Sequence, residues 1–369
     1  MKTSRNNSKA LYIHIPFCEH LCDYCDFTKL QYFTIFAKPY LDHLEKEIPN
    51  YQINHQLETI YVGGGTPTVL EDDLFVKLLE IIKPYSVGVL EYTFECNPES
   101  LSDFKLKKMK EYGVNRLSIG VESTNDEILK SINRHHSYED VKNAVLRAKS
   151  YDFDNINVDL ILGLPGSDIA QLKFDLENII SLNIQHLSCY SLTVHPNTVF
   201  FLKRIEEPNS DEGRQYYDVV HSFMKDHGFI HYEVSNWCLP NHESRHNYAY
   251  WKNEQYYGVG LGASGYLGNI RYTNTRSINE YLKDNYVASK EIVDKKDDIE
   301  YQIMLNLRTI EGINLLDFKD KFGFDLLEQK EAQIKKFISS HLLILKDNHL
   351  IPTYEGMMIL DSIILALID

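Results

Sequence analysis

The chain has 369 residues, of which 43% are hydrophobic and 25% are charged, and its formal net charge is −15. This length allows one large domain and a smaller one, because single hydrophobic cores stop growing near ~250–300 residues. The acidic balance argues against a nucleic-acid partner, whose binding usually needs a basic surface. No stretch approaches the ~20 apolar residues of a membrane span, and no apolar run follows the polar start. We therefore expect a cytoplasmic protein whose thiols stay reduced.

Short apolar runs alternate with amphipathic stretches over the first half of the chain. The expected strands are Ala10–Ile15, Thr59–Val62, Tyr92–Glu95, Arg116–Gly120, Ile156–Leu162 and His186–Leu192. The expected helices between them are Tyr40–Ile48, Asp72–Ile82, Asp103–Tyr112, Tyr138–Ser150 and Ala170–Leu182. This alternation predicts an α/β fold, a partial (β/α)6-type barrel on a parallel sheet. Within it, Thr124 and Glu127 have the spacing of a capping box at a helix start.

The pattern changes after Tyr286, and we place a domain boundary near residue 290, which divides the chain into residues 1–290 and 291–369. The second part is expected to be small and mostly helical. Its expected elements are the helices Asp298–Arg308, Leu315–Phe322 and Glu328–Ser340, a hairpin over Leu343–Ile351 and a last helix over Gly356–Ile368. Three helices and a hairpin resemble a winged helix. This part holds nine Lys or Arg against fifteen Asp or Glu, however, which argues against phosphate binding.

Three cysteines stand close together directly after the first expected strand, in the pattern Cys18-x-x-x-Cys22-x-x-Cys25. Iron–sulfur clusters are usually held by four cysteine thiolates, so three would leave one iron open to another ligand. One alternative is a structural zinc ion with His20 as its fourth ligand, and a second is three buried core thiols. The charged residues between the cysteines argue against a core strand. The remaining cysteines are isolated and are expected to be buried non-ligands: Cys96, Cys189 and Cys238.

Glycine-rich and acidic segments follow two further expected strands. Gly63–Gly64–Gly65–Thr66–Pro67–Thr68 follows the second strand, and consecutive glycines let backbone groups approach a ligand closely. Glu95 ends the third strand, where a carboxylate can pair with an ammonium group. Taken singly, a tight turn explains the first and a helix N-terminal charge explains the second. The recurrence of such segments at successive strand ends predicts a binding site, because α/β active sites lie at the carboxyl ends of the strands.

CxxxCxxC after a strand resembles the radical S-adenosylmethionine (SAM) superfamily, in which SAM binds the open iron of a [4Fe–4S] cluster. Further segments resemble one branch of it, the HemN/HemW group of anaerobic coproporphyrinogen III dehydrogenases and their relatives. These segments are LYIHIPFC, GGGTPT, ECNPES, RLSIGVES and DLILGLPG. The resemblance runs from near residue 10 to the C-terminus. It implies a radical SAM core over residues 1–290 and a HemN-type C-terminal domain over 291–369.

The same resemblance implies a set of site residues. Cys18, Cys22 and Cys25 would hold the cluster. The implied SAM contacts are Tyr12, Tyr24, Gly64, Gly65, Thr66, Glu95, Glu122, Arg134 and Asp159. Position 122 departs from the pattern, because the group usually has Gln there. A glutamate can still accept a hydrogen bond from a ribose hydroxyl, but it has no amide donor.

Three features resemble the haem chaperones of this group rather than its dehydrogenases. Phe27 stands where the dehydrogenases carry a fourth cysteine, and the triad begins too early for their N-terminal extension. The segment His246–Asn247–Tyr248–Ala249–Tyr250–Trp251 matches the HNxxYW motif of the haem chaperones. The resemblance therefore implies that His246 binds haem iron. The alternative is a hydrogen-bonded histidine within an aromatic core.

The expected function is to bind haem and transfer it to apo haem proteins, with a [4Fe–4S] cluster and SAM as cofactors. Two enzymatic alternatives stay open: oxidative decarboxylation of coproporphyrinogen III, and a radical SAM reaction on another substrate. Membrane-associated recipients and a homodimer are compatible with the sequence, which specifies neither. No catalytic residue is assigned, and His195 and Ser264 receive no role.

Overall fold

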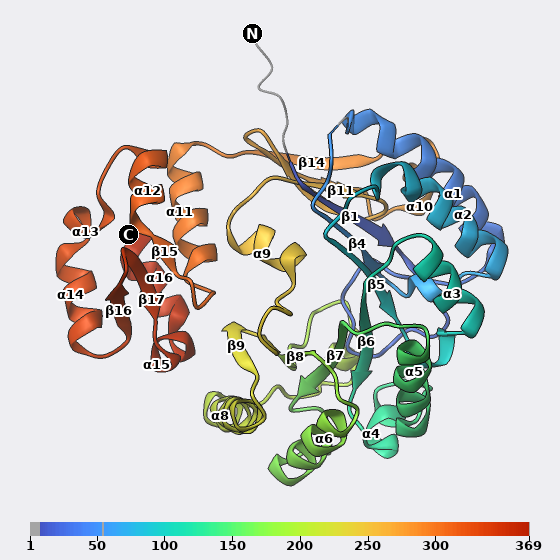
Figure 1. Cartoon of the computed structure of the whole chain (residues 1–369), viewed down its shortest axis with the longest axis horizontal. Helices are drawn as coiled ribbons and strands as arrows, with labels where there is room; N and C mark the ends of the chain where they lie inside the picture. The colour runs from blue at the N-terminus through green and yellow to red at the C-terminus, as the bar shows by residue number, and fades with distance from the viewer. Residues whose placement is uncertain (1–7, 54, 369) are drawn as a thin grey trace.

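The computed structural model describes residues 8–53 and 55–368. Its centre is a curved twelve-stranded sheet in the order β14-β13-β12-β11-β1-β4-β5-β6-β7-β8-β10-β9 (Figure 1). Seven neighbouring strands are parallel, and six of them, next to β11, are β1 (Ala10–Ile15), β4 (Thr59–Gly64), β5 (Glu91–Cys96), β6 (Arg116–Glu122), β7 (Ile156–Leu162) and β8 (His186–Ser191). They are the six predicted strands, with ends that differ by at most two residues. The predicted α/β partial barrel is confirmed.

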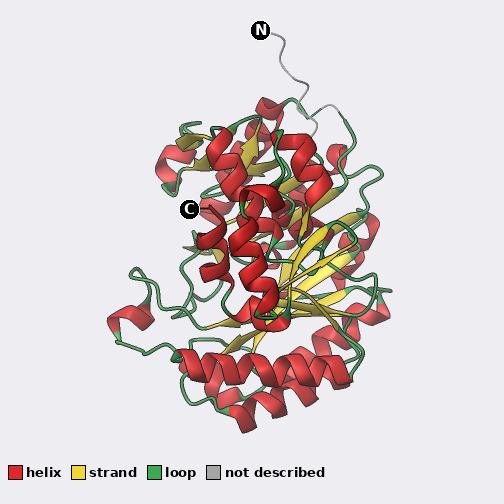
Figure 2. Cartoon of the chain, turned by 90° about the vertical axis from the view of Figure 1, so that its left-hand side faces the viewer, coloured by secondary structure: helices red, strands yellow, loops and turns green. Residues whose placement is uncertain are grey.

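Helices connect these strands and pack on the outer side of the sheet (Figures 1 and 2). They are α1 (Thr34–Glu47), α2 (Asp72–Ile82), α3 (Asp103–Glu111), α4 (Asp126–Ser131), α5 (Tyr138–Ser150) and α6 (Ile169–Ser181). The predicted capping box is wrong. Asn125 caps α4 instead, because its Oδ1 accepts from the amides of Glu127 and Ile128 at 3.0 and 3.3 Å. The Thr124 hydroxyl donates to buried Asp175 at 2.6 Å and is thereby withdrawn from the helix end.

Short strands that the sequence did not predict extend the parallel sheet at both ends. Beyond β1 lie β11 (Tyr256–Val259), β12 (Ser264–Leu267), β13 (Ile270–Asn274) and β14 (Val287–Ile292). Beyond β8 lie β10 (Asn236–Cys238) and β9 (Ile230–Glu233). Four helices accompany them: α7 (Val199–Leu202), α8 (Ser210–Asp226), α9 (Arg245–Trp251) and α10 (Ile278–Tyr281).

The last part of the chain has its own hydrophobic cluster, whose buried members lie between Ile303 and Leu367. Its helices are α11 (Lys295–Asn306), α12 (Leu315–Phe322), α13 (Leu326–Gln329), α14 (Glu331–Ser339), α15 (Tyr354–Met358) and α16 (Leu360–Ile368). Its small sheet consists of β15 (Ile313–Asn314), β16 (Leu343–Lys346) and β17 (His349–Pro352). The predicted hairpin is confirmed, whereas the predicted last helix is two helices. The boundary near residue 290 stays a prediction.

The segment after α11 is hydrogen-bonded to the outermost strand of the large sheet. The amide of Val234 donates to the Arg308 carbonyl at 3.1 Å, and the amide of Ile310 donates to the Tyr232 carbonyl at 3.0 Å. Glu233 and Thr309 form an antiparallel bridge between these bonds. The edge of β9 is thus covered by the chain itself. No helix within residues 8–53 and 55–368 is long and apolar enough to cross a membrane.

Candidate functional site

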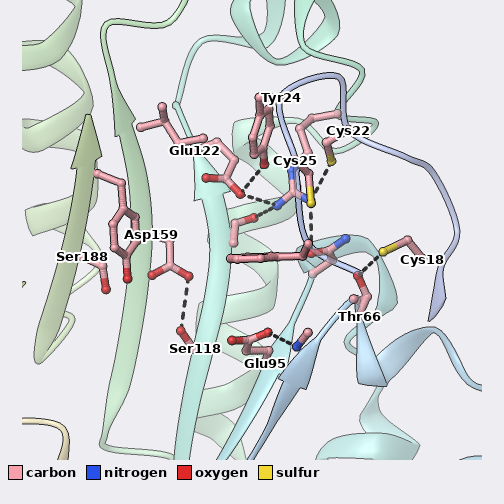
Figure 3. A pocket seen from close by; sticks show the side chains of 18 of the residues that line it. Cys18, Cys22, Tyr24, Cys25, Thr66, Glu95, Ser118, Glu122, Asp159 and Ser188 are labelled. Atoms are coloured by element: carbon pink, nitrogen blue, oxygen red, sulfur yellow. Dashed lines mark hydrogen bonds and ion pairs between the residues drawn. The ribbon is translucent and has the colours of Figure 1, made fainter. Parts of the chain in front are cut away.

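A cavity of about 510 Å³ opens at the carboxyl ends of the parallel strands, beneath the loop that carries the three cysteines. Eleven of the residues predicted for the cluster and for SAM line it (Figure 3). They are Cys18, Cys22, Tyr24, Cys25, Gly64, Gly65, Thr66, Glu95, Glu122, Arg134 and Asp159. The topology explains this convergence, because every parallel strand delivers its carboxyl end to the same edge.

The cysteine loop is held in place by backbone and side-chain hydrogen bonds. It leaves β1 through a short ribbon of β2 (Phe17–Cys18) and β3 (Leu30–Gln31), and the Lys29 ammonium donates to the carbonyls of Cys22 and Cys25. Burial and the neighbouring thiols raise the pKa of Cys18 to about 12, and burial raises the pKa of Cys25 as well. Iron binds thiolates, so occupation of this loop by a cluster must release protons.

The glycine turn after β4 makes room for Glu95. A Cβ at Gly63 would lie 2.5 Å from the Glu95 carboxyl carbon, and Gly64 has a φ of +109°, which glycine adopts without strain. The Gly64 amide and the Tyr61 hydroxyl donate to Glu95 at 2.8 and 2.7 Å. Burial nevertheless outweighs these hydrogen bonds and raises the pKa of Glu95 to about 7. The charge of Arg116 lowers the pKa of Glu95 by less than burial raises it.

Glu122 reaches the cavity through an irregular end of β6. The pairing of β6 with β7 shifts register between Gly120 and Glu122, and Glu122 has a φ of +68°. Such a left-handed conformation is strained for a non-glycine residue and is concentrated at functional sites. The Glu122 carboxylate accepts hydrogen bonds from Tyr24 at 2.8 Å and from Arg134 at 3.1 Å. The glutamate that stands here in place of the usual Gln thus forms an ion pair with the buried Arg134.

Asp159 lines the cavity from β7, two strands along the sheet from β5, which carries Glu95 (Figure 3). It accepts hydrogen bonds from Asn157 at 2.8 Å and from Ser118 at 3.3 Å. Burial, with the charge of Glu122 as the next cause, raises its pKa to about 6. Two carboxyl groups without an ion-pair partner among the described residues therefore line the same cavity.

Two predicted residues, Tyr12 and His246, do not line the cavity. The Tyr12 hydroxyl is 2.9 Å from His14 Nδ1. His246 is buried and lies beside the first residue of β4, at the opposite end of the strands. Its Nδ1 is 2.8 Å from Thr59 Oγ1, and its Nε2 is 2.8 Å from the Tyr250 hydroxyl. Burial lowers its pKa to about 3, so the imidazole is neutral. Only Asn247 of the HNxxYW segment lines the cavity.

Several cavity residues received no role from the sequence, although Asn97 lies within ECNPES and Arg116 and Ser118 lie within RLSIGVES. They are Asn97, Tyr61, Arg116, Ser118, Asn157, Ser188 and Tyr190. Most are inward positions of β4 to β8, which alternate along each strand. Barrel interiors are usually filled by Val, Ile and Leu, so polar residues at every second strand position could have indicated a cavity.

The cavity mouth carries Phe27, His20 and His195. The Phe27 side chain is 65% exposed. The His20 ring stacks on His135, and His195 Nε2 lies 3.5 Å from an Asp26 carboxylate oxygen. The isolated cysteines are buried as predicted, and Cys96 also contacts the cavity wall. Its thiol donates to the Phe94 carbonyl at 3.6 Å, and burial raises its pKa.

These residues fit the cofactors of a radical SAM protein. Three thiols on one loop surround the mouth, while the described residues contain no group of three His, Cys, Asp or Glu side chains close enough to hold a single metal ion. A zinc ion would draw its ligands to about 2.0–2.3 Å, so the zinc alternative finds no ready ligand set here. The carboxyls of Glu95 and Asp159 match the positive charges of SAM.

Comparison with known proteins agrees with this donor set. The Radical SAM superfamily matches residues 12–179, and the HemN C-terminal domain matches residues 293–359. The fold is similar to a solved structure described as coproporphyrinogen III oxidase (HemN) from Escherichia coli, with a TM-score of 0.85 and 20% identity. The match covers 98% of this chain and 90% of that one. Fold and cysteine loop together define a radical SAM protein.

Relatives over most of the chain bear the name heme chaperone HemW. The protein from Lactococcus lactis subsp. lactis (strain IL1403) is 39% identical, with 90% of each chain covered. Those from Bacillus subtilis (strain 168) and Escherichia coli (strain K12) are 38% and 32% identical, over 94% and 84% of this chain and 96% and 85% of theirs. The chain belongs to the HemW family.

Proposed function

We propose that this protein is a haem chaperone, which binds haem and transfers it to apo haem proteins while carrying a [4Fe–4S] cluster and SAM. Its membership of the HemW family over nearly the whole chain is the observation that carries this proposal. Phe27 supports it, because an exposed apolar ring occupies the position of the fourth cysteine in the related dehydrogenases. The proposal includes membrane-associated haem proteins among the recipients and a homodimer as the form of the chaperone.

The proposed cofactor residues follow from their position at one cavity. Cys18, Cys22 and Cys25 would hold the cluster. Glu95 would bind the SAM ammonium group, and the remaining lining residues would contact SAM: Tyr24, Gly64, Gly65, Thr66, Glu122, Arg134 and Asp159. Tyr12 stays a proposed contact that would require its hydroxyl to leave His14. When bound, the two cofactors supply one-electron chemistry.

His246 stays the proposed haem ligand, and its surroundings define what ligation requires. Haem iron is commonly held by a histidine nitrogen, but both ring nitrogens of His246 are engaged. Iron binding would therefore have to break the contact with Thr59 or with Tyr250, and α9 would have to move. We also propose the division into a core of residues 1–290 and a HemN-type domain of residues 291–369, which the separate hydrophobic cluster supports.

Anaerobic incubation of the reconstituted protein tests the function. With haem we expect a Soret band and transfer to an apo haem protein, and with coproporphyrinogen III and SAM we expect no decarboxylated product. Release of carbon dioxide without haem binding would select the dehydrogenase instead. His246→Ala should change the Soret maximum if His246 is the ligand. His20→Ala and His195→Ala are the matched controls, because both histidines lie at the accessible mouth of the cavity.

A further inference from the structure

Arg116 is a buried arginine that has no hydrogen-bond or ion-pair partner among the described residues. It is the first residue of β6, is 2% exposed and lines the cavity. Its Nε has no hydrogen-bond partner, and within residues 8–53 and 55–368 its guanidinium makes neither a hydrogen bond nor an ion pair. Arg134, the other arginine of this cavity, instead bonds to Glu122, Asn97 and the Gly120 carbonyl. A buried cation without a partner is costly, so it calls for an anion.

The position of Arg116 separates it from the carboxylates of the proposed SAM site. Arg116 pairs with Thr93, whereas Glu95 pairs with Ser118, one inward layer nearer the mouth. Two residues along a strand span about 6.5 Å, so Arg116 starts from a deeper level of the cavity. Its charge acts on Glu95 and Asp159, but burial still raises the pKa of both carboxyls. No hydrogen bond or ion pair within residues 8–53 and 55–368 joins Arg116 to either carboxyl group.

Several further groups of the cavity wall are neutral and polar. Ser118, Asn157, Ser188 and Asn247 line the same cavity, and Asn157 already donates to Ser118 at 2.7 Å. None of these groups carries a charge that could balance a guanidinium. The wall can, however, supply neutral hydrogen bonds to an anion held there. Besides the ion pair of Arg134 and Glu122, the cavity thus offers the positive charge of Arg116 and the two carboxyl groups of Glu95 and Asp159.

We propose that Arg116 binds a carboxylate group of the ligand that enters this cavity. A guanidinium matches a carboxylate with two parallel N–H···O bonds, which gives both charge and orientation. The inference rests on the proposed function for its ligands, since haem carries two propionates and SAM carries one carboxylate. The two sources share the recognised chemistry, and the experiment distinguishes them.

The test uses the full-length protein after anaerobic cluster reconstitution, with Arg116→Gln and Arg116→Lys. Dissociation constants are measured for haem, haem dimethyl ester and SAM. We expect Arg116→Gln to raise the dissociation constant of the carboxylate-bearing ligand by about tenfold or more, because a charge-assisted hydrogen bond is lost. Arg116→Lys should recover part of the affinity, because it keeps the charge without the planar fork. If haem is the source, the wild type should prefer haem to its dimethyl ester; if SAM is the source, only SAM binding should weaken.

Thermal melting without ligands separates binding from a structural role. Removing an unpaired buried charge should leave the melting temperature unchanged or raise it. Arg147→Gln is the matched control, because Arg147 lies outside the cavity and its Nη1 donates to the Leu101 carbonyl. The inference is overturned if Arg116→Gln lowers the melting temperature and leaves the haem and SAM constants unchanged. A wild type that binds no haem, with SAM weakened by Arg116→Gln, would refute the chaperone proposal and keep this one.

Discussion

Glu95 is the position at which burial most clearly prepares the site for a cation. Its pKa is raised to about 7, so the folded protein holds this proton more tightly than the unfolded chain does. The free energy of unfolding without ligand should therefore fall as the pH rises from about 4.5 through about 7. Binding of the SAM ammonium needs the ionised carboxylate, so SAM affinity should rise over the same interval.

Glu95→Gln should abolish both effects, because the amide does not titrate. At pH 8 we expect the ligand-free variant to melt a few degrees above the wild type, and the difference should shrink toward pH 4.5, where the Glu95 carboxyl of the folded wild type is protonated. SAM should bind about tenfold or more weakly, since a charge-assisted hydrogen bond is lost. Calorimetry across this pH range measures both quantities. A lower melting temperature at every pH together with unchanged SAM affinity would remove Glu95 from the site.

At the scale of single residues, the sequence predicted what contiguous motifs carry. The cysteine triad and the glycine turn are each short contiguous segments, and Glu95 stands at the end of a predicted strand. The sequence therefore indicated all three. Arg116 is the first residue of the RLSIGVES segment, but the sequence assigns it no role, because its lack of a partner among the described residues is a property of the folded cavity. His246 shows the opposite case. Its motif is specific, yet the sequence could not indicate that Thr59 and Tyr250 occupy both ring nitrogens.

Among the elements, α9 decides whether the HNxxYW segment can bind iron. Its end is tied to α11, because Asn306 donates to the Trp251 carbonyl and Asn253 donates to Asp298, both at 2.8 Å. Tyr250→Phe should free His246 Nε2 while keeping the ring that packs on Tyr256. The variant should lose about 0.5–1.5 kcal/mol of unfolding free energy with its hydrogen bond. If His246 is the ligand, haem should bind more tightly.

Tyr256→Phe is the control for this experiment, because its ring neighbours Tyr250 and its hydroxyl makes no hydrogen bond to His246. Denaturant unfolding and Soret titration on the same samples give both readouts. Equal haem affinity and an unchanged Soret maximum in both variants would argue that iron binds elsewhere, with the histidines at the cavity mouth as the next candidates.

The long elements were predictable because their apolar periodicity is strong. The strands β1 and β7 and the helices α2, α5 and α12 have the predicted bounds. The short strands β9 to β14 were missed, since each is only three to six residues long and β14 is exposed throughout. Most of them form hairpins with their neighbours in the chain, but β11 and β10 join the parallel strands β1 and β8 through partners far away in the chain, which local sequence does not specify. The capping box failed for a similar reason, because a tertiary contact with Asp175 withdrew Thr124.

For the whole molecule, the contact between residues 308–310 and β9 couples the C-terminal part to the core. Ile310→Pro removes the amide that donates to the Tyr232 carbonyl, whereas Ile310→Ala keeps it. We expect the proline variant alone to lose protection of the β9 amides in hydrogen exchange. It should also become sensitive to proteolysis near residue 290. Equal protection in both variants would mean that side-chain packing, and not this backbone pairing, joins the two parts.

The covered edge of β9 also has a consequence for biosynthesis. Residues 308–310 leave the ribosome after all twelve strands of the large sheet, so β9 stays an open edge until the C-terminal part emerges. An open edge offers unpaired amides and carbonyls to other chains. Nascent chains arrested before this point should therefore self-associate. Pairing of residues 308–310 with β9 is the last event that covers the edge of the sheet and prevents such association.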